Sequence, residues 1–158
     1  MTDSQLPTWH PAALVATWFG VGRLPVAPGT WGSAVTLPIA WFLALWLGPI
    51  WLLAVAAVVF AAGWWAADVY ARRNEADDPG EVVVDEVAGQ LVALAVVPVD
   101  LIYYAAAFVL FRIADIWKPF PVSLAERRLG GGLGIMADDI VAGGYAAIVL
   151  VAALEALA

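Results

Sequence analysis

Two segments within the first 90 residues of the 158-residue chain combine charge or glycine with a helix start. Residues 20–33, GVGRLPVAPGTWGS, form a loop whose glycines let backbone N–H groups turn toward an anion. Asp85 and Glu86 open an apolar segment. Both have simpler explanations: the loop is also typical of a turn with Ser33 as helix N-cap, and paired acids are stabilised by the helix dipole.

A third segment places Arg112, Asp115 and Lys118 at positions i, i+3 and i+6. This spacing puts the three side chains along one side of a helix, which Pro119 ends. A cation–acid–cation set there could bind phosphate. A structural Arg–Asp–Lys pairing predicts the same spacing.

The fourth segment, 130–139, has four glycines before Asp138 and Asp139, which we expect to begin the last helix. Asp138 as an ordinary N-cap is the alternative. The sequences DEVAG (85–89) and DIVAG (139–143) each place Asp four residues before Gly. Because glycine lets another helix approach closely, this echo predicts that two helices meet and bring their acids together.

Such a collection of acids predicts a divalent cation, because like charges near a low-dielectric medium repel unless neutralised. The chain has no Cys, and its single His, His10, lies in the N-terminal lead-in. Oxygen ligands alone favour Mg²⁺, Mn²⁺ or Ca²⁺ over Zn²⁺. Mg²⁺ combines one or two carboxylates with phosphate oxygens and leaves nearby Arg and Lys to hold the remaining phosphate charge. The pattern therefore predicts metal-assisted phosphoryl chemistry, with water as the simplest nucleophile and an aspartyl intermediate as the alternative.

The elements that position these residues must lie in a membrane. Hydrophobic residues make up 64% of the chain and charged residues 13%, with nine Trp. A domain this short cannot hide so much apolar surface from water, so lipid must cover part of it. The net charge of −7 argues against a nucleic-acid partner.

Apolar stretches predict a compact bundle of four or five membrane-embedded helices. They cover about 34–47, 50–67, 87–97, 101–117 and 140–157. Several fall below the roughly 20 residues that a spanning helix needs. We expect residues 1–11 to be a polar N-terminal tail and residues 12–158 to form a single helical domain.

The basic residues predict the topology. If the helices alternate, all seven fall on one side: Arg23, Arg72, Arg73, Arg112, Lys118, Arg127 and Arg128. The opposite turns, 48–49 and 98–100, contain none. The positive-inside rule then places the polar chemistry on the cytoplasmic face.

Taken together, the four segments resemble the phosphatidylglycerophosphatase A family. The matching stretches are GVGRLPVAPGTWGS (20–33), DPGEVVVDEVAG (78–89), FRIADIWKPFP (111–121) and GGLGIMADDIVAG (131–143). They occur in the family's order and at similar spacing. The resemblance implies an all-α fold and a Mg²⁺-dependent bacterial inner-membrane enzyme. Such an enzyme removes the terminal phosphate of phosphatidylglycerophosphate to give phosphatidylglycerol.

The resemblance also implies residue roles. The metal-binding and catalytic acids would be Asp85, Glu86, Asp115, Asp138 and Asp139. Lys118 would act in catalysis and, with Arg112, bind phosphate. The anion pocket would be completed by Arg23, Thr30 and Ser33. Two alternatives stay open: a small transporter or channel, and a phosphatase acting on another lipid or on a soluble phosphate ester.

Overall fold

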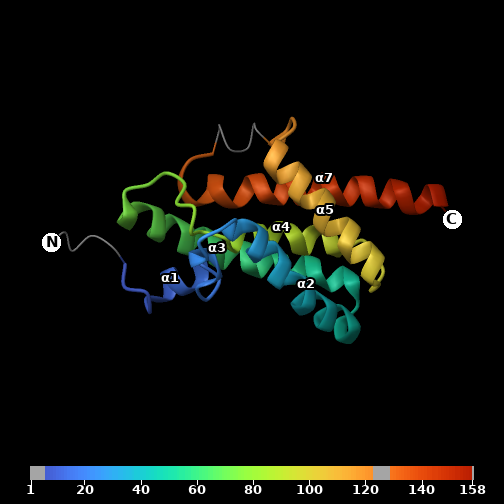
Figure 1. The fold of residues 1–158 in the computed structure, drawn as a ribbon, viewed down its shortest axis with the longest axis horizontal. Coiled ribbons are helices and arrows are strands. Elements are labelled where there is room, and N and C mark those ends of the chain that lie inside the picture. Colours follow the sequence, from blue (N-terminus) through green and yellow to red (C-terminus); the bar gives the residue numbers. More distant parts are fainter. Residues whose placement is uncertain (1–5, 123–128, 158) are drawn as a thin grey trace.

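The computed structural model describes residues 6–122 and 129–157, which form a bundle of helices (Figure 1). The longer helices are α2 (Pro28–Leu47), α3 (Leu52–Asn74), α4 (Val84–Leu94), α5 (Leu101–Trp117) and α7 (Gly131–Leu157). The short α1 (Pro11–Ala16) precedes them, and two 3-10 turns, η1 (Val21–Arg23) and η2 (Pro49–Trp51), flank α2. The described residues contain no strand, so the predicted all-α class is confirmed. Arg127 and Arg128 of the predicted topology lie outside the described residues.

Three helical segments are long and apolar enough to cross a membrane: Pro28–Leu47, Pro49–Asn74 and Gly131–Leu157. Their outward faces carry exposed apolar side chains such as Phe42, Val58 and Ile148. A water-soluble protein of this size rarely leaves so much contiguous apolar surface uncovered. The chain is therefore a membrane protein.

Helix α4 occupies the middle of the bundle and contacts α2, α3, α5 and α7. Its 11 residues give a length of only about 16 Å, well short of a bilayer's hydrocarbon core. Eight of these residues are buried, so protein rather than lipid surrounds the helix on most sides. A short central helix of this kind places its first turn, with Asp85 and Glu86, inside the bundle.

Two glycines set the crossing of α4 and α7. A Cβ atom built on Gly143 would lie 2.3 Å from the carbonyl oxygen of Gly89, and one on Gly89 would lie 2.4 Å from that of Asp139. Only glycine permits this approach of the two backbones. The close helix contact predicted from the repeated Asp-x-x-x-Gly pattern is thus confirmed.

The start of α7 differs from the prediction. The helix begins at Gly131, so Asp138 and Asp139 lie about two turns inside it rather than at its N-terminus. Gly132 packs against α3, where a Cβ would lie 2.5 Å from backbone atoms of Trp64 and Asp68. The glycines there serve helix packing, and tertiary contacts outweigh their low helix propensity.

Different parts of the chain form the two ends of the bundle (Figure 1). The end of α3, the start of α4 and the start of α7 gather at one end, called the polar end because these segments carry Arg72, Asp85 and Asp138. The α2–α3 turn, the α4–α5 turn and the C-terminus gather at the other, called the apolar end because Trp46, Trp51 and Leu101 are exposed in and beside its turns. The N-terminal lead-in also packs on the protein, because Leu6 contacts the buried cluster of α1 and α3. The domain boundary after residue 11 stays a prediction.

Candidate active site

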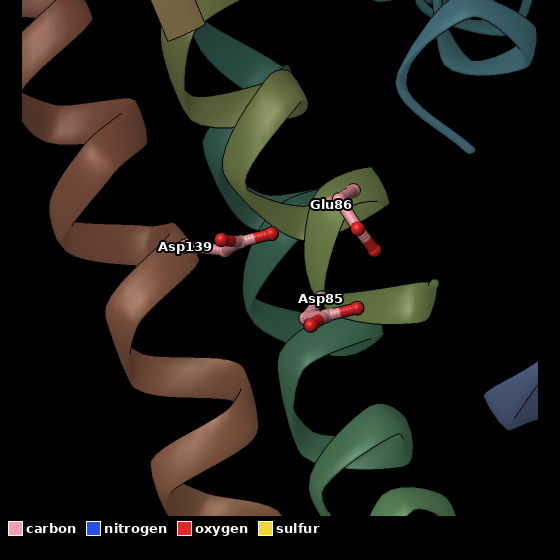
Figure 2. A group of neighbouring side chains, drawn as sticks. All are labelled: Asp85, Glu86 and Asp139. Atoms are coloured by element: carbon pink, nitrogen blue, oxygen red, sulfur yellow. The ribbon is translucent and has the colours of Figure 1, made fainter. Parts of the chain in front are cut away.

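Three carboxylates from α4 and α7 form the centre of the site (Figure 2). One oxygen from each of Asp85, Glu86 and Asp139 lies within 4.8 Å of the other two. Asp85 and Glu86 occupy the first turn of α4, and Asp139 points across from α7. The convergence that the sequence predicted for these three acids is therefore present.

The first turn of α4 does not use its acids as caps. The residue before the helix is Val83, and no side chain of the described residues caps that end. Asp85 and Glu86 instead line a cavity. Both acids lie in the first turn, where the helix dipole stabilises them, but this simpler interpretation does not account for their position in the cavity.

Each of the three acids has a shielded oxygen without a partner. Oδ1 of Asp85, Oε2 of Glu86 and Oδ2 of Asp139 are buried and accept no hydrogen bond from any described residue. An unpaired buried carboxylate oxygen is costly, and its usual partners are a cation or a donor. Three clustered acids, each with such an oxygen, fit a hard divalent cation such as Mg²⁺.

The electrostatics of α4 agree with this fit. Burial raises the pKa of Asp85 well above its usual value, and the neighbouring charges of Glu86 and Asp139 raise it further. Burial also raises the pKa of Glu86, although the Arg112 guanidinium acts in the opposite direction. The protein alone therefore disfavours the fully ionised cluster, and a bound cation would relieve this repulsion.

Helix α5 brings two cations to the rim of the cluster. Nη1 of Arg112 lies 2.5 Å from Oδ2 of Asp115 and 3.9 Å from Oε1 of Glu86. Lys118, which ends the helix in a left-handed conformation, donates a hydrogen bond to Oδ2 of Asp138 at 3.0 Å. Both Arg112 and Lys118 line the same cavity as the acids.

These contacts divide the five predicted metal ligands into two groups. Asp85, Glu86 and Asp139 form the cluster with unpaired oxygens. Asp115 and Asp138 instead form ion pairs with Arg112 and Lys118, respectively. Asp138 also accepts a hydrogen bond from the backbone N–H of Asp139 through Oδ1. The structure thus brings all five acids to one site but favours three of them as ligands.

The cavity has a volume of about 510 Å³ and opens at the polar end of the bundle. The starts of α2 and α7 and the segment before α4 complete its walls. That segment contributes Asp77 and Asp78, to which the sequence analysis gave no role. Their position next to the matching stretch 78–89 was the available signal.

The segment predicted as a glycine loop contributes differently from the prediction, because its residues from Pro28 onward belong to α2. Gly29 lies against the cluster, where a Cβ would be 2.0 Å from Oε1 of Glu86 and 3.4 Å from Nη1 of Arg112. Its role is to leave room for these two side chains. In the sequence, only the glycine content of residues 20–33 indicated this role of Gly29.

The three polar residues predicted to complete the anion pocket lie elsewhere among the described residues. Ser33 donates its hydroxyl to the carbonyl oxygen of Gly29 at 3.0 Å, a bond within its own helix. Thr30 lines an apolar groove beside α5. Arg23 lines a separate pocket with Tyr70 and Glu81. Their anion-binding roles remain predictions without a supporting contact.

Fold and site together define a helical membrane protein with a carboxylate centre flanked by two cationic side chains, Arg112 and Lys118. Comparison with known proteins extends this description. The sequence profile of phosphatidylglycerophosphatase A matches residues 14–154. Phosphatidylglycerophosphatase A of Escherichia coli strain K12 is 38% identical over 151 residues, covering 95% of this chain and 87% of the relative.

Two further relatives match over most of their length. Phosphatidylglycerophosphatase A of Haemophilus influenzae is 38% identical over 144 residues, covering 90% of this chain and 88% of the relative. A protein of Bacteroides thetaiotaomicron named putative phosphatidylinositol-3-phosphatase is 41% identical over 155 residues, covering 93% of this chain and 95% of that protein. No solved structure matches the fold.

The chain belongs to the phosphatidylglycerophosphatase A family. It is accordingly an enzyme of the phosphoric monoester hydrolase class. This membership confirms the resemblance seen in the four sequence segments, and it favours an enzyme over the transporter or channel alternative.

Proposed function

We propose that this protein hydrolyses the terminal phosphate of phosphatidylglycerophosphate and depends on Mg²⁺ for doing so. The observation that carries the proposal is the cluster of Asp85, Glu86 and Asp139, with three unpaired oxygens, beside Arg112 and Lys118. Water and the phosphate ester give phosphatidylglycerol and inorganic phosphate. We place the site at the cytoplasmic face of a bacterial inner membrane, which the protein crosses several times, in line with the positive-inside pattern.

The cluster would hold the metal through one oxygen of each of its three acids. When bound, Mg²⁺ supplies Lewis-acid polarisation of a phosphate oxygen and lowers the pKa of a bound water. The five acids predicted as ligands then have two tasks. Asp85, Glu86 and Asp139 bind the ion, while Asp115 and Asp138 hold the two cations in place.

Arg112 is suited to bind the phosphate. Its Nη1 is held by Asp115, and its Nε is buried with no acceptor among the described residues. A guanidinium can donate two parallel hydrogen bonds to phosphate oxygens, so an unpaired Nε–H is a ready donor. Lys118, oriented by Asp138, adds a second positive charge at the cavity. These cations would stabilise the charge that develops on the phosphoryl group.

The membrane location suits a lipid substrate. The phosphate of a lipid headgroup lies at the interface, while its acyl chains stay in the bilayer. A cavity at the polar end of a membrane bundle can receive that phosphate without extracting the lipid. Binding energy is then available for positioning the phosphate rather than for removing acyl chains from the bilayer.

A related headgroup is the second candidate substrate. The Bacteroides relative named putative phosphatidylinositol-3-phosphatase is as similar to this chain as the two phosphatidylglycerophosphatases. A different phosphate ester on a lipid could reach the same cluster. The comparison of the two headgroups belongs in the same assay.

The test is phosphate release by purified protein over a small substrate panel, with and without Mg²⁺. The panel contains phosphatidylglycerophosphate, phosphatidylinositol 3-phosphate and glycerol 3-phosphate. We expect the first to be the preferred substrate and chelation of divalent cations to stop turnover. Preference for another ester would change the substrate assignment, and full activity in excess chelator would refute the metal site.

A further inference from the structure

An apolar groove lies beside the acid cavity, on the outer side of α5. Its volume is about 270 Å³. The side chains of α5 that line it are Phe108, Val109, Arg112, Ile113, Ile116 and Trp117, and Thr30 of α2 completes it. Val109, Ile113 and Ile116 are between 46% and 67% exposed, so the groove opens outward to the surroundings of the bundle.

Arg112 connects the groove to the site. It lines both the groove and the acid cavity, and its guanidinium lies 3.9 Å from Glu86 of the carboxylate cluster. A molecule lying in the groove with a negative group beside Arg112 would present that group to the cavity. The chemistry on the two sides of Arg112, apolar outside and polar inside, matches an amphiphile with an anionic head.

We propose that this groove holds the hydrophobic part of the lipid phosphate monoester while its phosphate enters the cavity past Arg112. The proposal rests on the proposed function and adds the route by which the substrate approaches, sideways from the bilayer between α2 and α5. Occupancy of the groove would align the ester before it reaches the carboxylate cluster.

The groove would act through orientation more than through affinity. Lipid tails are as apolar as the groove, so moving a chain from bilayer to groove yields little hydrophobic free energy. Holding the chain in one direction, however, limits the positions of the phosphate and raises the fraction of productive encounters. A blocked groove should therefore impair long-chain substrates while sparing esters too short to occupy it.

The absence of cysteine allows this to be tested in protein that has already folded. Ile113→Cys places a unique thiol in the groove, and Ile148→Cys places one on the outward face of α7, where residue 148 is 72% exposed. Both variants are purified, treated with hexyl methanethiosulfonate, and later restored with a thiol reductant. Phosphate release is measured with long-chain phosphatidylglycerophosphate and with a four-carbon-chain analogue in the same detergent.

We expect the hexyl group at position 113 to lower kcat/KM for the long-chain ester roughly tenfold, the scale set by steric exclusion from an apolar pocket. The short-chain ester should be turned over as before, reductant should restore activity, and modified Ile148→Cys should match the wild type. Unchanged long-chain activity after complete modification at position 113 would overturn the proposal.

Other outcomes would overturn it as well. Equal loss with both esters would mean that the modification disturbs Arg112 or displaces a bystander lipid rather than the substrate. Equal loss in the two cysteine variants would mean a general effect of a bulky group. Wild-type protein without activity on either ester would overturn the proposed function together with the groove, which distinguishes that failure from the others.

Discussion

Each end of the bundle has an aspartate near the start of a helix, and the two aspartates differ in their hydrogen bonding. At the apolar end, Asp100 precedes α5 and accepts a hydrogen bond from the backbone N–H of Ile102 at 2.8 Å. At the polar end, Asp85 lies in the first turn of α4 with an oxygen that is buried and unpaired among the described residues. The first is satisfied by its own helix, whereas the second has no hydrogen-bond partner among the described residues and faces a cavity.

The difference between these two aspartates comes from the packing around them. Helix α5 begins in an exposed turn, where a capping side chain keeps contact with water. Helix α4 begins in the interior, facing α7 and the basic side of α5. The same residue type near a helix start therefore caps its own helix at one end and lines a cavity with an unpaired oxygen at the other.

The largest effect should follow removal of one ligand charge. Asp85→Asn or Asp139→Asn should lower kcat by roughly 1,000-fold, because loss of a metal-ion effect costs several kcal/mol of transition-state stabilisation. Without divalent cations, either variant should be at least as stable as the wild type, since one repelling charge is gone. Phosphate release and thermal unfolding in chelator measure the two expectations.

The matched control for these variants is Asp100→Asn. Asparagine caps helices about as well as aspartate, so this variant should keep both stability and turnover. If Asp100→Asn lost as much activity as Asp85→Asn, the different environments of the two aspartates would not explain the effect on turnover.

The next effect concerns the phosphate-binding cation. Arg112→Ala should lower kcat/KM roughly 100-fold, as expected for loss of a charged donor to the transition state. Arg72→Ala is the control, because Arg72 pairs with Asp68 on the surface at 2.8 Å and its side chain is 78% exposed. Steady-state kinetics measure the two values. An equal fall of kcat/KM in Arg112→Ala and Arg72→Ala would argue against a specific role for Arg112.

A smaller effect should follow from crowding the cluster. Gly29→Ala would place a methyl group 2.0 Å from the present position of Oε1 of Glu86 and displace that carboxylate. We expect turnover to fall about tenfold, because catalytic groups shifted by about 1 Å lose much of their effect. Gly144→Ala, whose Cβ would meet nothing within 4 Å, should leave turnover unchanged. Equal kinetics for the two alanine variants would contradict the contact between the first turn of α2 and Glu86.

The smallest effect belongs to the apolar end. Asp100→Ala removes the cap of α5 and should lower the free energy of unfolding by about 1 kcal/mol. Turnover should not change, since residue 100 lies away from the cavity. Thermal unfolding in detergent measures the first expectation, and an activity loss at full stability would contradict the second.

Much of the fold was predictable because its signals are local. Runs of apolar residues between Gly, Pro and charged breaks predicted five helices near their observed positions. The repeated Asp-x-x-x-Gly pattern predicted the contact of α4 with α7, which Gly89 and Gly143 make. Convergence of Asp85, Glu86 and Asp139 followed from that contact.

The errors arose where distant contacts decide the outcome. The glycines at 130–134 predicted a loop, but Gly132 packs on α3 and the segment is helical from Gly131. The division of the acids into a cluster of three and two ion-pair partners depends on how α5 crosses the other helices, which its sequence does not reveal. The same holds for Thr30, which shares a groove with Arg112 and with apolar side chains of α5.

The central claim is that Asp85, Glu86 and Asp139 share one divalent cation. Its most direct test is the thermal unfolding midpoint of the wild type and of Asp139→Asn, each measured in detergent with chelator and then with excess Mg²⁺. A ligand that binds only the folded state raises its stability, so the wild type should gain several degrees with Mg²⁺ and Asp139→Asn should gain almost none. An equal gain in both proteins would contradict the shared-ion site.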